Sequence, residues 1–309
     1  MNEQTFYNRE VPRVVDPTQP FPDATVNDYR SVPETIRALQ AVEQGSRGII
    51  GENALVARLG ELAQRRPVPI VIFNCIGFEF SENNGSYPQA TPLMDAPSIA
   101  QFYARDITNI VNMLQQDGEP DVSILVPDSE LDTRVLNIPM RDDELVVTRD
   151  ALKGTLTDTL RNLPFKVELL SEYAKRFGLE DPKTYTESNY KKIKQEKKIK
   201  KSHVASERDY FRGREMSESY LSGISDEVIA DRLAWYFGMY AGEGQMLAES
   251  RAIIVNLEDD GRVSSWLARG AAQNFGKTVD SPLPILTPVQ TKDFVKLRRT
   301  RKDMRRCII

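Results

Sequence analysis

An amide and a thiol interrupt the first long apolar run of this 309-residue chain, PVPIVIFNCIGFEF (67–80). In the tetrapeptide Asn74-Cys75-Ile76-Gly77 the thiol lies beside a glycine, where backbone amides can approach an acyl oxygen. Cys75 therefore fits a nucleophile that accepts an acyl group, with Asn74 beside it. A free Cys is also among the most buried residue types and behaves as a small hydrophobe, so an inert Cys75 remains the alternative.

Three carboxylates follow the second apolar run, VSILVP (122–127). Asp128, Glu130 and Asp132 lie within five residues, and this much negative charge at a strand end suits a cationic substrate. Asp128 also fits the N-cap of a following helix, with the other carboxylates favouring the helix dipole. Because burying an unpaired carboxylate is costly, a crevice-facing residue of the three needs a cationic partner from the protein or the substrate.

A third group of polar residues lies on a predicted helix at 226–249. Tyr236, Tyr240 and Glu243 fall at i, i+4 and i+7, so they share one helix face. A glutamate on an otherwise aromatic face is either partnered or functional. Tyrosines at this spacing also occur as ordinary core residues, which is the alternative here.

Strands and helices alternate along the elements that must position these groups. Such alternation predicts an α/β fold with a Rossmann-like, mainly parallel sheet and helices on both faces. Ligands bind such sheets at the carboxyl ends of the strands, which selects the residues after Ile72, Leu125 and Val255. We expect strands at 67–80, 122–127, 165–170, 251–257 and 283–289, and a turn-rich loop at 83–92. We expect helices at 31–43, 53–65, 95–116, 141–162, 226–249 and 264–272. The residues from 171 to about 215 are expected to be helical and strongly charged.

Charge is distributed unevenly along the chain. The net charge is −4, yet residues 191–201 and 292–306 carry +6 each, which leaves −16 for the remainder. Two basic segments on an acidic body fit a contact with a polyanion such as nucleic acid, and a solvated helix face with a basic tail is the alternative. We expect an N-terminal arm with helices (1–65), a Rossmann-like catalytic domain (66–290) and a basic tail (291–309). The lysines of the first basic segment are Lys191, Lys192, Lys194, Lys197, Lys198, Lys200 and Lys201.

Several common classes of protein are not supported by the sequence. The single histidine, His203, cannot supply a zinc site of two imidazoles, and its place in the lysine run does not suit a Ser-His-Asp triad. GAAQNFGKT (270–278) is one residue too long for a phosphate-binding loop, and GEG (242–244) lacks the third glycine of a dinucleotide fingerprint. No apolar run approaches the roughly 20 residues that cross a bilayer, so we expect a cytoplasmic protein without membrane contact.

The order of these features resembles the cyclodipeptide synthases, a family similar in fold to the catalytic domain of class Ic aminoacyl-tRNA synthetases. The matching pieces, spread over residues 66–260, are IVIFNC (70–75), ILVPDSELDTRVL (124–136), the lysine run and YFGMYAGEG (236–244) before RAIIVNL (251–257). Cys75 replaces the serine nucleophile of the bacterial members, and Tyr240-x-x-Glu243 replaces their Tyr-x-x-x-Glu. The chain resembles the fungal arginine-containing cyclodipeptide synthases more, and it is more weakly similar to isocyanide synthases.

The resemblance implies a tRNA-dependent reaction without ATP, metal or other cofactor, because the ester bond to tRNA already carries the activation. One aminoacyl group moves to an enzyme nucleophile, Cys75 or the nearby Ser81 or Ser86. The amine of a second aminoacyl-tRNA then attacks, and the product is a diketopiperazine. The resemblance implies that Glu243 holds or deprotonates the amine and that Tyr240 orients it.

The remaining roles follow from the same resemblance. Asn74 and Tyr236 would line the substrate pocket, and the lysine run would contact aminoacyl-tRNA. If one substrate is arginyl-tRNA, Asp128, Glu130 or Asp132 would supply the carboxylate that a planar guanidinium requires. Two alternatives remain open: an isocyanide synthase-like enzyme that acts on a free amino acid, and an RNA-binding protein without enzymatic activity.

Overall fold

The computed structural model describes residues 49–63, 66–73, 78–83, 86–92, 121–126, 165–212, 223–256, 262–276 and 280–286, with short pieces between 150 and 162. The helices predicted at 31–43 and 95–116, the N-terminal arm and the basic tail lie outside these residues and stay predictions. The same holds for Asn74 and Cys75, and for the carboxylates Asp128, Glu130 and Asp132.

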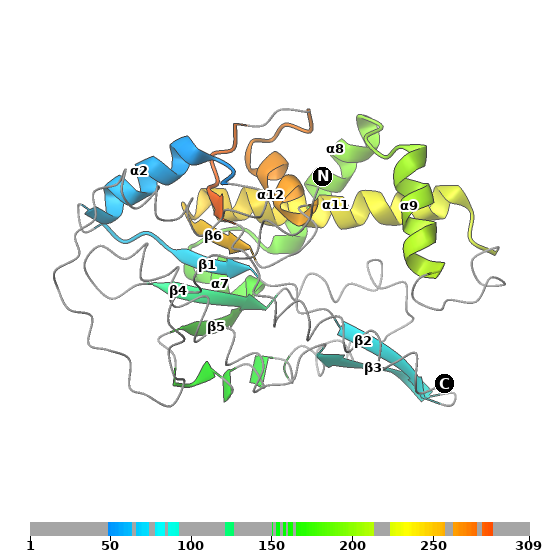
Figure 1. The fold of residues 1–309 in the computed structure, drawn as a ribbon, viewed down its shortest axis with the longest axis horizontal. Coiled ribbons are helices and arrows are strands. Elements are labelled where there is room, and N and C mark those ends of the chain that lie inside the picture. The colour runs from blue at the N-terminus through cyan, green and yellow to red at the C-terminus, as the bar shows by residue number, and fades with distance from the viewer. Residues whose placement is uncertain are drawn as a thin grey trace, which may run out of the picture.

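A five-stranded parallel sheet forms the centre of the described structure (Figure 1). Its strands run in the spatial order β5-β4-β1-β6-β7, and every neighbouring pair is parallel. All residues of β1, β4 and β6 are buried, as expected for strands covered on both faces. The predicted Rossmann-like α/β fold is therefore confirmed. The strands are β1 (Ile70–Phe73), β4 (Val122–Val126), β5 (Lys166–Leu169), β6 (Ile253–Asn256) and β7 (Ile285–Leu286).

The strand order places a topological switch point between β1 and β6. From β1 the chain moves outward through β4 to β5, then returns to β6 on the other side of β1 and moves outward to β7. In open parallel sheets, ligands bind in the crevice at the carboxyl ends of the two strands that flank such a point. Those ends are Phe73 and Asn256, which are partners in the strand register.

The apolar run at 67–80 is divided between two sheets, so the prediction of one continuous strand was wrong. β1 ends at Phe73, and β2 (Phe78–Asn83) pairs antiparallel with β3 (Ser86–Pro92) in a separate two-stranded sheet. The sequence of β2, FEFSEN, begins with alternating apolar and polar residues, which is typical of a strand with one solvated face. The loop predicted at 83–92 was also wrong. A two-stranded sheet has only edge strands, which tolerate the prolines of β3.

The described helices longer than one turn are α2, α7, α8, α9, α11 and α12. The longest, α11, has the predicted bounds: Ser225 caps it by accepting a hydrogen bond from the Val228 N–H, and two acidic residues occupy its first turn. No helix among the described residues has the length and hydropathy to span a membrane. The bounds are α2 (Glu52–Ala63), α7 (Leu170–Arg176), α8 (Pro182–Gln195), α9 (Lys201–Arg212), α11 (Asp226–Glu249) and α12 (Arg262–Ala271). The described residues at 150, 153–154, 157–158 and 160 are also helical, in agreement with the prediction at 141–162.

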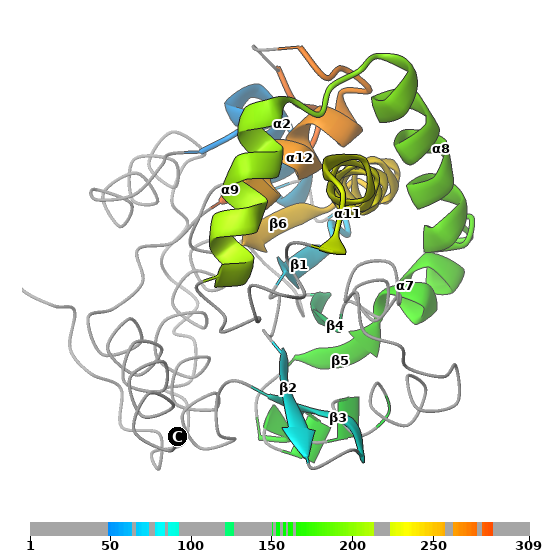
Figure 2. The same cartoon turned by 90° about the vertical axis from the view of Figure 1, so that its right-hand side faces the viewer.

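Glycines allow α11 to lie very close to the helices on either side of it (Figure 2). A Cβ added at Gly242 would lie 2.7 Å from the backbone N of Thr186 on α8. On the other side, a Cβ at Gly244 of α11 would collide with the backbone of Leu267 on α12, and Gly270 of α12 approaches α11 in the same way. The glycines at 242–244 and at 270, which resemble parts of nucleotide-binding motifs, therefore serve helix packing.

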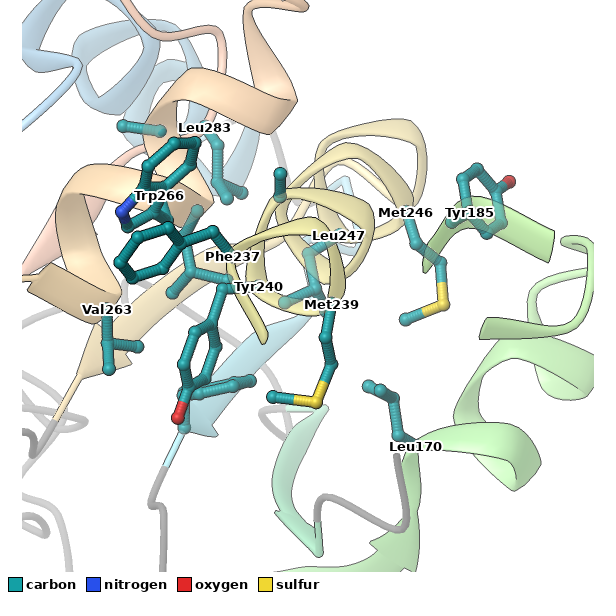
Figure 3. Close-up of a cluster of buried hydrophobic side chains, with 14 of the residues drawn as sticks. Leu170, Tyr185, Phe237, Met239, Tyr240, Met246, Leu247, Val263, Trp266 and Leu283 are labelled. Atoms are coloured by element: carbon teal, nitrogen blue, oxygen red, sulfur yellow. The ribbon is translucent and has the colours of Figure 1, made fainter. Parts of the chain in front are cut away.

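One cluster of buried apolar side chains joins a face of the sheet to α7, α8, α11 and α12 (Figure 3). The ring of Phe237 on α11 stacks on Trp266 of α12, with centroids 4.5 Å apart and planes 11° from parallel. This packing holds α11 across the carboxyl end of β1. The residues that the sheet contributes are Val71, Phe73, Leu125, Ile254 and Ile285.

Candidate functional site

Tyr240 packs against the carboxyl end of β1. Its side chain is 1% exposed, and its ring meets the ring of Phe73 edge-on, with centroids 6.3 Å apart. Figure 3 shows Tyr240 projecting from α11 toward β1, between Met239 and Val263. Since Phe73 is the last residue of β1, Tyr240 lies where the chain leaves the sheet toward the predicted nucleophile.

Tyr236 lies one helical turn before Tyr240 and contacts it through both ring and hydroxyl. The two hydroxyl oxygens are 3.1 Å apart, and the ring centroids are 4.8 Å apart in an edge-on arrangement. Tyr236 is half-buried whereas Tyr240 is buried, so the pair of phenols leads from a partly exposed position into the interior. Phenol hydroxyls both donate and accept, so such a pair can orient an amine or hold a proton.

Glu243 lies three residues after Tyr240 on the same helix and is fully buried. An ionised carboxylate in the interior is costly unless polar or charged groups compensate it, which makes such a residue unusual in a helix that otherwise buries apolar and aromatic side chains. The contact between the tyrosines confirms that Tyr236 and Tyr240 share a helix face. The catalytic and substrate-binding roles of all three residues stay predictions.

The other predicted strand-end residues begin at the same edge of the sheet. Cys75 and Asn74 follow β1, the carboxylates at 128–132 follow β4, and both segments lie outside the described residues. Phe73 and Leu125 are register partners in adjacent parallel strands, so the chain leaves both strands at one edge.

Sequence reasoning missed a polar pair at the neighbouring strand end. Asn256 closes β6 and is fully buried, and its Nδ2 donates a hydrogen bond of 2.6 Å to Oγ of Ser264 on α12. Asn256 and Phe73 are register partners, so their side chains lie on the same face of the sheet. The signal in the sequence is a polar residue at the end of an otherwise apolar strand, IIVN.

Three lysines of the basic segment bind other parts of the protein. Lys192 donates to the Gln273 carbonyl at 2.7 Å, beyond the end of α12, and its Nζ lies 5.2 Å from the ring centroid of Phe275. Lys194 pairs with Asp231 of α11, and the hydrogen bonds that its ammonium donates to Asp231 and to the Tyr190 hydroxyl raise the pKa of Lys194. Lys198 forms an ion pair of 3.2 Å with Glu196.

The other four lysines lie at the corner between α8 and α9 or on the exposed side of α8. In the described part of the chain, their ammonium groups form no ion pair or hydrogen bond. Lys197 adopts φ = 50° in the turn that ends α8, where the Lys198 N–H donates to the Ile193 carbonyl at 3.1 Å. Glycine is favoured at such a position, and a lysine there costs about 1 to 2 kcal/mol. The four exposed residues are Lys191, Lys197, Lys200 and Lys201.

A separate polar cluster, formed by Asp121, Ser123, Glu168 and Arg176, joins β4 and β5 to α7. We call it the α7 cluster. Arg176 donates to Asp121 at 2.6 Å, to Glu168 at 2.6 Å and to Ser123 at 2.9 Å, while Ser123 donates to Glu168 at 2.5 Å. Burial alone would raise the pKa of Asp121, but hydrogen bonds and positive charge from Lys166 and Arg176 outweigh it and hold that pKa below its usual value. The opposite charges of the α7 cluster therefore compensate each other, which is typical of a cluster that stabilises the fold.

Comparisons with known proteins leave the family of this chain unassigned. No known family model matches the sequence, and no curated protein matches it. The solved structures similar to the chain include two enzymes. The PvcA protein from Pseudomonas aeruginosa is 14% identical with a TM-score of 0.44, over 85% of this chain and 93% of that one. Tyrosyl-tRNA synthetase from Aeropyrum pernix is 11% identical with a TM-score of 0.39, over 83% of this chain and 61% of that one. At these scores, neither similarity assigns an activity.

The structure thus places a contacting pair of tyrosines at the end of β1, a buried asparagine at the end of β6 and a buried glutamate three residues after Tyr240 on α11. Within the described ranges, no group of three or more His, Cys, Asp or Glu residues is arranged to hold a metal ion. Hydroxyl, carboxylate and amide groups can orient an amino acid and move its protons.

Proposed function

We propose that the protein is a tRNA-dependent cyclodipeptide synthase that joins two aminoacyl groups, one of them arginyl, into a diketopiperazine. The observation that supports this most strongly is the position of Tyr236 and Tyr240 on α11. Their hydroxyls are linked, and the ring of Tyr240 meets Phe73, the last residue of β1, edge-on. The candidate nucleophile Cys75 follows two residues later in the sequence.

The reaction begins when the Cys75 thiolate attacks an aminoacyl-tRNA ester. A thioester forms, and the 3′-terminal ribose oxygen of the tRNA leaves and takes up a proton. The amine of a second aminoacyl-tRNA then attacks the thioester, which forms the peptide bond and frees the thiol. Finally, the amine of the first residue attacks the remaining ester, which closes the ring and releases the second tRNA.

In this scheme Glu243 and Tyr240 act on the amines. Glu243 accepts the proton that an ammonium must lose before it can attack, and Tyr240 holds the amine in line through its hydroxyl. Tyr236 positions Tyr240 through the contact of 3.1 Å between their hydroxyls.

The arginyl group is assigned to the carboxylates that follow β4. A planar guanidinium binds a carboxylate through two parallel hydrogen bonds, and Asp128, Glu130 and Asp132 are the acids nearest to that strand end in the sequence. Changing the crevice-facing acid to Asn should sharply reduce the use of arginyl-tRNA and spare the second substrate. Equal losses for both substrates would contradict the arginine assignment.

The direct test compares two sources of amino acid. The protein is incubated with a total tRNA pool charged with all twenty amino acids, and in parallel with the free amino acids alone. Mass spectrometry should detect a diketopiperazine in the first reaction, and ribonuclease treatment of the charged pool should abolish it. Product from free amino acids alone, or no product from either source, would contradict the proposal.

A second candidate is an enzyme that acts on a free amino acid without RNA. The observation in its favour is that Lys192, Lys194 and Lys198 bind groups within the protein, which leaves fewer charges for RNA. Tyrosine and glutamate side chains around a switch point suit a free amino acid as well. The same incubation separates the two candidates.

The division of the lysines gives a test of RNA binding with an internal control. Replacing the exposed lysines with Gln should weaken tRNA binding and flatten its salt dependence, by close to one unit of log-log slope for each lost phosphate contact. The control replaces Lys192, Lys194 and Lys198, and should leave the slope unchanged. Equal slopes in wild type and both variants would exclude this segment from the RNA contact. The exposed residues to replace are Lys191, Lys197, Lys200 and Lys201.

A further inference from the structure

A shallow groove lies on the exposed face of α8. The opposite face of this helix packs against the glycines of α11, so the groove faces away from α11 (Figure 2). Its volume is about 610 Å³. The residues that line it recur every three or four positions, which places them side by side on the helix surface. Among them are Thr184, Ser188, Lys191 and Gln195.

Three neutral side chains of the groove are exposed and available to a ligand. In the part of the chain that the structure describes, the hydroxyls of Thr184 and Ser188 and the amide of Gln195 form no hydrogen bond. Each of these groups can both donate and accept. At a rise of about 1.5 Å per residue, the row from Thr184 to Gln195 extends over roughly 16 Å, which suits an extended ligand.

The charges along the groove favour phosphate groups toward the C-terminal end of α8. Lys191 is exposed in the groove, and the exposed lysines at the corner between α8 and α9 continue this positive charge. Of the two acids that line the groove, Glu196 is compensated by Lys198 at 3.2 Å. Glu187 lies one turn before Lys191 and repels phosphates from the other end.

We infer that the groove binds the minor groove of an RNA duplex, such as a base-paired arm of a tRNA, and that its neutral side chains recognise the ribose 2′-hydroxyls. Duplex RNA presents these hydroxyls along a wide, shallow minor groove, which suits an exposed row of donors and acceptors. Lys191 and the corner lysines bind the flanking phosphates, which carry no information about the sugar. A nucleic acid partner rests on the proposed function, whereas the recognition of the 2′-hydroxyl rests on the side chains of the groove.

The test compares an RNA hairpin with a 2′-fluoro hairpin of the same sequence, which keeps the A-form duplex and lacks the hydroxyls. Fluorescence anisotropy measures the binding of each to the full chain. Wild type should bind the RNA about 10-fold more tightly, the combined effect of a few hydrogen bonds. A groove variant that combines Thr184→Val, Ser188→Ala and Gln195→Met should bind both hairpins with the affinity that wild type has for the 2′-fluoro hairpin. All three residues are exposed, so these changes should leave the fold intact.

Two control variants separate recognition of the sugar from other effects. Thr157→Val changes an exposed threonine outside α8 and should keep the full preference for RNA. Replacing the corner residues Lys197, Lys200 and Lys201 with Gln should weaken the binding of both hairpins by the same factor. The inference is overturned if wild type binds the two hairpins equally. It is also overturned if the groove variant keeps the preference, or loses affinity for both hairpins alike.

Turnover with charged tRNA separates this inference from the proposed function. A wild type that prefers RNA through the groove but makes no diketopiperazine would overturn the proposed function alone. A wild type that makes the product, with a groove variant that still prefers RNA over the 2′-fluoro hairpin, would overturn this inference alone.

Discussion

Two groups of polar side chains, each partly buried, lie along the parallel sheet, and they differ in composition. In the α7 cluster Arg176 donates to both carboxylates, Lys166 also pairs with Asp121, and Ser123 completes the hydrogen bonds, so two cations face two anions. The other group, Tyr236, Tyr240 and Glu243, consists of two phenols and a carboxylate. We call it the α11 cluster.

This difference indicates that the two clusters have different roles in the protein. A matched set of charges fixes secondary-structure elements to each other, because removing any member leaves a buried charge uncompensated. Phenols and a carboxylate can donate and accept protons, and Tyr240 of this group lies against the last residue of β1, at the switch point where such sheets bind ligands. We therefore propose a stabilising role for the α7 cluster and a chemical role for the α11 cluster.

The largest expected effect comes from Glu243→Gln. This change keeps the shape of the side chain and removes its ability to accept a proton, so product formation should fall by about 10² to 10⁴-fold. The midpoint of thermal unfolding, measured in parallel, separates a loss of activity from a loss of folded protein. Glu249→Gln, at the exposed end of the same helix, should keep full activity. Full activity in Glu243→Gln would remove Glu243 from the mechanism.

The opposite pattern is expected for Arg176→Leu. Loss of the guanidinium removes the cation that pairs with Glu168 and leaves Asp121 with Lys166 alone, which should lower the free energy of unfolding by about 2 to 4 kcal/mol. Urea denaturation measures this loss. The rate per folded molecule should equal that of wild type, and a large drop in that rate would show that the α7 cluster also serves the reaction.

A smaller effect is expected for Tyr236→Phe, which removes one hydroxyl from the tyrosine pair. The loss of a single hydrogen bond corresponds to about 0.5 to 1.5 kcal/mol, so kcat should fall by no more than about 10-fold. Tyr185→Phe is the control, because its hydroxyl donates to Glu249 at 2.5 Å on the α8 side of the helix. Burial and that carboxylate raise the pKa of Tyr185 to about 12, so it stays a neutral donor. Equal kinetics in the two variants would limit Tyr236 to a packing role.

The pH dependence of stability gives the smallest effect. Because Lys166 and Arg176 depress the pKa of Asp121 in the folded protein, this carboxyl contributes stability that is fully present above its unfolded pKa of about 3.9. The contribution is lost as the pH falls through the lower, folded pKa. The stability difference between wild type and Asp121→Asn should therefore be constant from pH 5 to 7 and shrink below about pH 4. A constant difference at all pH values would contradict the proposed ionic role of Asp121.

The sequence predicted the elements of the sheet well where a strand is a short apolar run between polar residues. VSILV and IIVN are buried on both faces, so their composition reflects their surroundings directly. The run at 67–80 failed because β1 and β2 follow each other closely and both contain apolar residues, although they belong to different sheets. Nothing local in the chain marks that separation except the alternation that begins in FEFSEN.

The α11 cluster was predictable in part for the same kind of reason. Helical periodicity is a local property, so the shared face of Tyr236 and Tyr240 follows from their spacing. The contact of Tyr240 with Phe73 and the pairing of Asn256 with Ser264 depend on strand order and helix packing, which spacing does not specify. The sequence likewise does not show which lysines bind groups within the protein and which stay exposed. That division depends on the packing of α8 against α11 and α12.

The central claim, that this chain accepts an aminoacyl group from tRNA at the carboxyl edge of β1, is tested most directly by trapping the acylated protein. The protein is mixed with the charged tRNA pool for seconds and quenched in acid, and the mass of the intact chain is measured. We predict an added mass of one aminoacyl group, located by proteolysis on the peptide that contains Cys75 and absent from Cys75→Ala. An active Cys75→Ala variant that carries the group on Ser81 or Ser86 would move the nucleophile to the β2–β3 sheet. No adduct with charged tRNA in any variant would contradict the claim.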